Sequence, residues 1–200
     1  MAARSEPDFF SFLGLPRKLR IDIADLEQRY RALSRQFHPD YFYNASAAER
    51  RASLERSSYL NDAYRTLKNP VARVEYLLKL EQATGSGAVA PQATPSGGHN
   101  PKVPAGLLEE VFALNEELDE IREMKSSGAP DEAWRTRLES ARGPIEAKKR
   151  EHEASLEALS AKWDAEDGDK AAILTALNER ILERNYITNL LAGIERELQA

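Results

Sequence analysis

The 200-residue sequence contains no cysteine. Without a thiol, this chain cannot form a disulfide, a thiolate zinc site, a cysteine-ligated iron–sulfur cluster or a cysteine nucleophile. No apolar run approaches the roughly 20 residues that a helix needs to cross a bilayer. Residues 1–7 are too short and too polar for a signal peptide. These absences predict a cytoplasmic protein that has no membrane partner.

Histidine is also scarce, with only three residues in the chain. His38 follows an amphipathic segment, His99 lies in a glycine-rich stretch and His152 lies in a charged run. A histidine zinc site needs several ligands brought together, and these three are too scattered for one. We therefore expect no metal and no cofactor, and we expect His99 and His152 to lie at the surface.

Charge is unevenly divided along the chain. Residues 1–81 carry 14 Lys and Arg against 11 Asp and Glu, whereas residues 82–200 carry 14 against 22. The acidic second half argues against a nucleic-acid partner. The basic run at residues 148–150 has acidic neighbours at Glu146, Glu151 and Glu153, so we interpret it as a solvated helix face.

Glycine and proline separate two regions with helical periodicity. Residues 82–106 hold five of the ten glycines and four of the ten prolines, which is typical of a flexible linker. Neither flanking region contains an alternating strand pattern of useful length. The sequence therefore predicts an all-α protein, with one helical domain at residues 1–81 and a three-helix bundle at residues 107–200. The bundle helices are expected at about 104–125, 130–160 and 168–198.

The first domain shows clear helix boundaries. Asp22 is suited to cap a helix, and Ser46 with Glu49 forms the pattern of a capping box for the next one. Between these points one apolar stripe recurs at helical spacing and is expected to be buried: Leu26, Tyr30, Leu33 and Phe37. Pro39 disfavours helical geometry at His38, so the first of the two helices should end there.

A charged loop follows this stripe. Arg31 and Arg35 lie one turn apart on the opposite side of the helix, and His38-Pro39-Asp40 comes directly after them. A cationic face beside a donor ring and a carboxylate suits docking onto an acidic, hydrogen-bonding surface. The alternative is an ordinary turn beside solvating charges. A third possibility, a His38–Asp40 general-base pair, lacks the concave pocket that catalysis needs.

The order of these features resembles the J domain of DnaJ-type co-chaperones: short helix, basic helix, His-Pro-Asp, capped helix, then Leu-Asn-Asp-Ala-Tyr-Arg-Thr-Leu at residues 60–67 and Pro70. The resemblance implies an antiparallel helical hairpin with flanking short helices. It implies that Arg31, Arg35, His38, Pro39 and Asp40 engage an ATPase chaperone and stimulate its ATP hydrolysis, so the protein itself is not the enzyme. Many J domains carry a basic residue after the aspartate, where this chain has Tyr41.

Three further segments look like HscB, the J-type co-chaperone of iron–sulfur cluster assembly. They are residues 8–16, residues 70–80 and the acidic Asn-Glu-Glu-Leu-Asp-Glu-Ile at residues 115–121. The resemblance implies two partners, an HscA/DnaK-type ATPase chaperone and an IscU-like scaffold protein on which clusters are built. A bundle that recruits a different client protein remains the alternative.

The acidic segment also has an unusual apolar pattern. Its core stripe is Leu107, Val111, Leu114, Leu118 and Ile121, and Leu108 and Phe112 fall outside it, beside Glu116, Asp119 and Glu120. An apolar centre with a charged rim is typical of a binding surface, although a broad core face that buries both residues is the alternative. We predict scaffold contacts at Leu108, Phe112, Glu116 and Glu120.

The last helix offers one more candidate. Its expected core face is Ile173, Leu177, Ile181, Thr188 and Leu191, and Tyr186 lies on the opposite side. The resemblance implies that an aromatic residue near this position joins the acidic helix in holding the scaffold, so Tyr186 is a further predicted contact. Position 109 is acidic where the family tends to be apolar, and position 113 is alanine where an acid is common.

Overall fold

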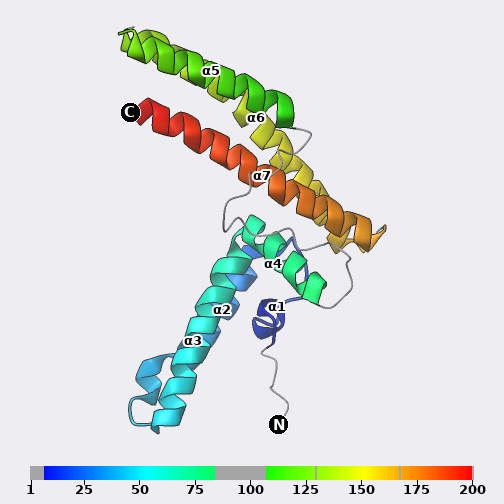
Figure 1. Ribbon diagram of the computed structural model, residues 1–200. Coiled ribbons are helices and arrows are strands. Elements are labelled where there is room, and N and C mark those ends of the chain that lie inside the picture. The colour runs from blue at the N-terminus through cyan, green and yellow to red at the C-terminus, as the bar shows by residue number, and fades with distance from the viewer. Residues whose placement is uncertain (1–6, 84–106, 129, 167, 200) are drawn as a thin grey trace. The chain divides into compact units, whose positions relative to one another are not determined.

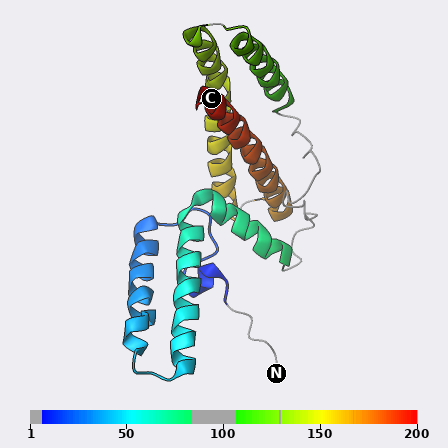
Figure 2. The same ribbon diagram turned by 60° about the vertical axis from the view of Figure 1, so that its left-hand side comes forward.

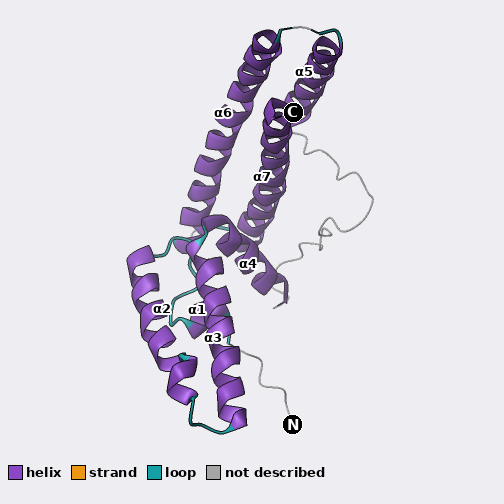
Figure 3. Ribbon diagram, turned by 90° about the vertical axis from the view of Figure 1, so that its left-hand side faces the viewer, coloured by secondary structure: helices purple, strands orange, loops and turns teal. Residues whose placement is uncertain are grey.

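The computed structural model describes residues 7–83, 107–128, 130–166 and 168–199, and these residues form helices and loops without a strand (Figures 1 and 3). The order is α1 (Phe9–Phe12), α2 (Ile23–Phe37), the 3-10 helix η1 (Pro39–Phe42), α3 (Ala47–Lys68), α4 (Pro70–Ala83), α5 (Leu108–Ser126), α6 (Asp131–Asp164) and α7 (Lys170–Gln199). The predicted all-α fold is confirmed. Within the described ranges, every helix is too short or too polar to cross a bilayer.

The described residues group into two compact units. The first contains α1 to α4 together with residues 160–173. The second contains α5, the part of α6 up to residue 159 and the part of α7 from residue 174. Helix α4 extends to Ala83, and the rest of the predicted linker lies outside the described residues.

The helix boundaries of the first unit follow from side-chain caps. The carboxylate of Asp22 accepts hydrogen bonds from the backbone N–H groups of Ala24 and Asp25, at 2.8 and 3.4 Å. Ser46 and Glu49 form the complete capping box at the start of α3. Both caps confirm the sequence prediction. Helices α2 and α3 then run side by side in opposite directions, as Figures 1 and 2 show.

The core of the first unit lies where α1, α2 and α4 pack against α3. Its most completely buried large side chains are Phe10, Leu26, Leu60, Leu67 and Leu77. The predicted buried stripe of α2 is correct only at Leu26, because Tyr30, Leu33 and Phe37 are half-buried. Tyr30 instead stacks on Tyr64 of α3, with ring centroids 4.1 Å apart. Helix α2 is therefore covered mainly along one edge.

Two charged side chains hold the chain segment that joins α1 to α2. Arg73 is only 4% exposed, and its guanidinium donates hydrogen bonds to the carbonyl oxygens of Leu67 and Leu19. The carboxylate of Asp164 accepts from the N–H groups of Leu19 and Arg20, each at 2.7 Å. A connecting segment has no ladder to satisfy its backbone groups, so these side chains supply the partners.

The second unit has a core to which all three of its helices contribute. Helix α5 supplies Leu114, Leu118 and Ile121, α6 supplies Trp134, Leu138 and Ile145, and α7 supplies Ile187 and Ile194. Leu107 is also buried and Val111 is half-buried, so the predicted core stripe of α5 is confirmed. This packing is the predicted three-helix arrangement.

The surface position expected for His152 is wrong. Its side chain lies between α6 and α7 and is only 4% exposed, with Nε2 2.5 Å from the carbonyl oxygen of Arg180. Burial lowers the pKa of His152 below its ordinary value of 6.5. The residues next to His152 in the sequence are charged, and for this reason the sequence did not indicate that position 152 faces α7. His99 lies outside the described residues.

This buried imidazole predicts a pH-dependent stability. The folded state keeps His152 neutral, so the unfolded state binds more protons once the pH falls below the unfolded pKa of about 6.5. The stabilisation is complete above that value and is lost as the pH falls toward the folded pKa. We expect urea unfolding to give a smaller free energy of unfolding at pH 5.5 than at pH 7.5. His152→Asn should reduce that difference, and an unchanged difference would contradict this assignment.

Candidate functional site

The loop between α2 and α3 is shaped by Pro39. Helix α2 ends at Phe37, and His38 has an extended backbone with φ −63° and ψ 129°. Pro39 then opens η1. The N–H of Asp40 donates to Nδ1 of His38 at 3.3 Å. This contact occupies Nδ1, so Nε2 is the ring nitrogen left to contact another molecule.

The predicted charged residues of this loop lie in solvent together. The His38 side chain is 51% exposed and that of Asp40 is 86% exposed, with Oδ2 of Asp40 3.4 Å from Nδ1 of His38. Arg31 and Arg35 are exposed on the last turns of α2. Arg31 is only 3.8 Å from Glu27, a surface pair that contributes little. Two guanidiniums, a ring donor and a carboxylate are therefore available to one partner surface.

Two serines of α3, which the sequence did not indicate as functional, hold the start of this loop. The hydroxyls of Ser53 and Ser57 both donate to the carbonyl oxygen of Phe37, at 2.8 and 2.7 Å. They lie one turn apart on α3 and satisfy a carbonyl at the end of α2, where no helical partner is left. Arg50 also donates to the carbonyl of Tyr43 at 3.4 Å. In the sequence, the i, i+4 spacing of the serines indicates that both lie on one face of α3. It does not indicate which carbonyl oxygen they contact.

Removing both hydroxyls should destabilise the first unit. The double variant Ser53→Ala with Ser57→Ala leaves the Phe37 carbonyl without its two donors. An unsatisfied acceptor costs about 1–3 kcal/mol when it is fully buried, and this carbonyl is partly buried, so we expect a loss of about 1 kcal/mol. Each single variant should cost clearly less, because the other hydroxyl still donates. Chemical denaturation measures all three. A double variant that is as stable as the wild type would contradict this assignment.

Helix α5 exposes the apolar pair that the sequence placed outside the core. Phe112 is 70% exposed and Leu108 is 39% exposed, one turn apart. Leu114, Leu118 and Ile121 are buried on the opposite side. The expected exposure is confirmed, and the alternative of a broad core face is wrong. An exposed phenylalanine on an ordered helix is a feature of contact surfaces.

Acidic side chains surround this pair. Glu109 and Glu116 are exposed, and α5 as a whole carries seven acidic residues against two basic ones. Glu120 is 53% exposed and forms an ion pair of 2.5 Å with Arg137 of α6. The surface thus has an apolar centre and a negative rim, which would attract a cationic partner.

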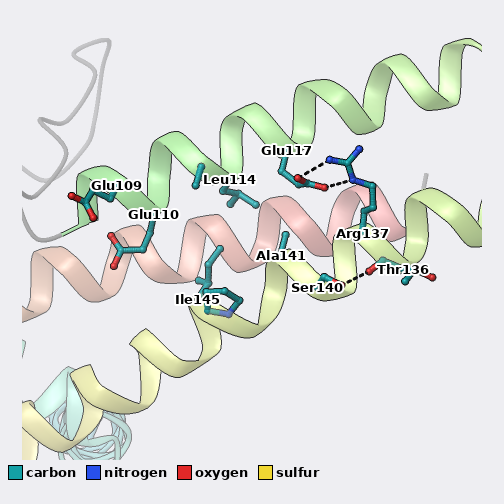
Figure 4. A pocket seen from close by; sticks show the side chains of 11 residues that line it. Glu109, Glu110, Leu114, Glu117, Thr136, Arg137, Ser140, Ala141 and Ile145 are labelled. Atoms are coloured by element: carbon teal, nitrogen blue, oxygen red, sulfur yellow. Dashed lines mark hydrogen bonds and ion pairs between the residues drawn. The ribbon is translucent and has the colours of Figure 1, made fainter.

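An open groove of about 610 Å³ lies between α5 and α6, next to this surface (Figure 4). Leu114, Ala141 and Ile145 line its floor, and Glu109 and Glu110 stand at one end. The bidentate pair of Glu117 with Arg137, at 2.6 and 3.0 Å, closes the other end. Acidic and apolar side chains therefore extend from the exposed face of α5 into the groove between α5 and α6.

Tyr186 is placed differently from the prediction. Its side chain is half-buried and packs against the core of α5, α6 and α7. Thr188, which was expected in the core, is exposed, and Ile187 is buried in its place. The core face of α7 includes Ile187 and Ile194 rather than Thr188. The buried positions of this part of α7 are therefore shifted by one residue from those that the periodicity predicted.

Neither region resembles a catalytic or metal centre. Across the described part of the chain, no three His, Asp or Glu residues gather as a possible metal site. His38 and Asp40 are both well exposed to solvent. A general base works best in a partly desolvated pocket, so this exposure favours a contact role over catalysis.

Comparison with known proteins gives one family match and two similar solved structures. The model of the DnaJ domain family matches residues 8–76. The chain is similar to the solved structure of the chaperone HscB from Vibrio cholerae, with a TM-score of 0.59 and 25% identity over 95% of this chain and 96% of that one. It is also similar to the human co-chaperone protein HscB, with a TM-score of 0.65 and 26% identity over 98% of this chain and 85% of that one.

Proposed function

Because this chain is a J-domain co-chaperone of the HscB type, we propose that it links two proteins during iron–sulfur cluster assembly in the cytoplasm. Its J domain, residues 1–81, would bind an HscA/DnaK-type ATPase chaperone and stimulate ATP hydrolysis on that partner. Residues 107–200 would bind an IscU-like scaffold and deliver it to the same chaperone. Residues 82–106 would connect the two.

One observation carries this proposal: the chain exposes two chemically different contact surfaces, each built on helices with their own core. The His38 loop combines exposed positive charge with a ring donor and a carboxylate. The α5 surface combines the exposed Phe112 ring with a negative rim. Opposite charge and different chemistry at the two surfaces suit two different partners.

The chaperone contacts in this proposal are Arg31, Arg35, His38, Pro39 and Asp40. The arginines would attract an acidic surface, while His38 and Asp40 would make directional hydrogen bonds. The scaffold contacts are Leu108, Phe112, Glu116 and Glu120. Tyr186 would contribute through the part of its ring that remains accessible, since the rest packs against the core.

A steady-state ATPase assay tests the proposal with the full chain. Purified HscA/DnaK-type chaperone should hydrolyse ATP faster when the protein is added, and faster still when an IscU-like scaffold is added with it. No stimulation of any such chaperone would overturn the co-chaperone role. Stimulation without binding of the scaffold would favour the alternative, in which the second region recruits a different client.

A further inference from the structure

The two most exposed large apolar side chains in the described ranges lie directly beside the His38 loop. Tyr41 is 73% exposed and Tyr43 is 79% exposed. Phe42 between them is half-buried. Exposed apolar residues scattered singly need no explanation, but two such rings next to a contact loop do.

The backbone that carries these rings is held in place. The N–H of Tyr41 donates to the carbonyl of His38 at 3.1 Å, and the N–H of Tyr43 lies 3.5 Å from the carbonyl of Asp40. Arg50 donates to the carbonyl of Tyr43. Several hydrogen bonds therefore hold the backbone of the 3-10 turn that carries the rings. Little backbone entropy would be lost on binding.

Tyr41 also contacts the His38 ring itself. The ring centroids are 6.2 Å apart, with an interplanar angle of 75°, which is an edge-to-face arrangement. A partner that reaches His38 would therefore meet Tyr41 at the same time. The sequence places this aromatic ring where many J domains have a cation. The surface beside His38 therefore has less positive charge and more apolar area than in those domains.

We propose that Tyr41 and Tyr43 are additional chaperone-contacting residues, which bind an apolar strip next to the acidic surface that Arg31 and Arg35 would face. This inference rests on the proposed function, and it adds apolar contacts to the charged and hydrogen-bonding contacts proposed above. Tyrosine supplies a large apolar surface at a small entropic cost and keeps a hydroxyl for a hydrogen bond. The apolar part of the contact is not screened by salt, whereas the arginine part is.

Affinity for the chaperone measured at several salt concentrations tests the proposal. Tyr41→Ala should weaken binding about tenfold, as expected for the loss of a central aromatic contact, and the double variant Tyr41→Ala with Tyr43→Ala should weaken it further. The loss should be similar at every salt concentration. Arg35→Ala should instead reduce the salt dependence itself. Tyr41→Phe should bind nearly as well as the wild type, and Tyr41→Lys should bind with a steeper salt dependence.

Ile23→Ala serves as the matched control, since Ile23 is an exposed apolar residue at the opposite end of α2. It should bind as the wild type does. If the tyrosine variants bind normally while His38→Gln no longer stimulates the ATPase, this inference is overturned and the proposed function stands. If the tyrosine variants bind weakly while His38→Gln stimulates normally, the contact stands and the proposed role of His38 is wrong. A wild-type chain that binds no such chaperone overturns both.

Discussion

His38→Gln and Asp40→Asn should each nearly abolish stimulation of the partner chaperone's ATPase while leaving the fold intact. Asp40 lies in solvent, and His38 contacts only Asp40 and Tyr41 of the same loop, so neither replacement disturbs a core. In the complex they would become central, directional contacts, and truncation of such a contact costs about 2 kcal/mol or more, which is about 30-fold. Phosphate release at steady state, measured over a range of co-chaperone concentrations, gives the size of the loss.

A charge-matched control distinguishes this loss from a general effect of charge. Asp62 is also exposed, on α3, and pairs only with Arg65 at 2.5 Å among the contacts that the structure shows for it. Asp62→Asn should therefore stimulate as the wild type does. Unfolding temperatures of all three variants should agree. Full stimulation by His38→Gln or Asp40→Asn would remove the basis for assigning this loop to the chaperone.

Phe112→Ala should reduce the affinity for an IscU-like scaffold by about 30-fold, the effect of removing an aromatic anchor worth about 2 kcal/mol. The ring is 70% exposed in the free protein, so its removal leaves no cavity and should not alter stability. Glu116→Ala should have a smaller effect, concentrated in the association rate and in the salt dependence, because a rim charge steers more than it anchors. Titration calorimetry or surface plasmon resonance measures both.

The first unit offers the matching apolar control. Leu54 on α3 is 57% exposed, and Leu54→Ala removes a similar exposed side chain away from α5. Its affinity for the scaffold should equal that of the wild type. Glu123→Ala, on an exposed position nearer the end of α5, controls for the charge. If Phe112→Ala binds as tightly as Leu54→Ala, the exposed α5 face does not hold the scaffold.

The sequence alone determined the local features of this protein. Asp22, Pro39 and the pair Ser46–Glu49 define helix ends through interactions within a few residues, so their effect does not depend on the rest of the fold. The exposure of the His38 loop follows from the same boundaries. Periodicity also placed Leu108 and Phe112 outside the core of α5, because the apolar stripe of that helix is narrow and regular.

The tertiary structure decided which surfaces meet. His152 is buried only because its face of α6 meets α7, and Tyr186 packs inward because the core face of α7 is shifted by one residue from the periodic expectation. The carbonyl of Phe37 receives the Ser53 and Ser57 hydroxyls because α3 lies against the end of α2. Such contacts join residues far apart in the chain, and periodicity within one helix contains no information about the register of its neighbour.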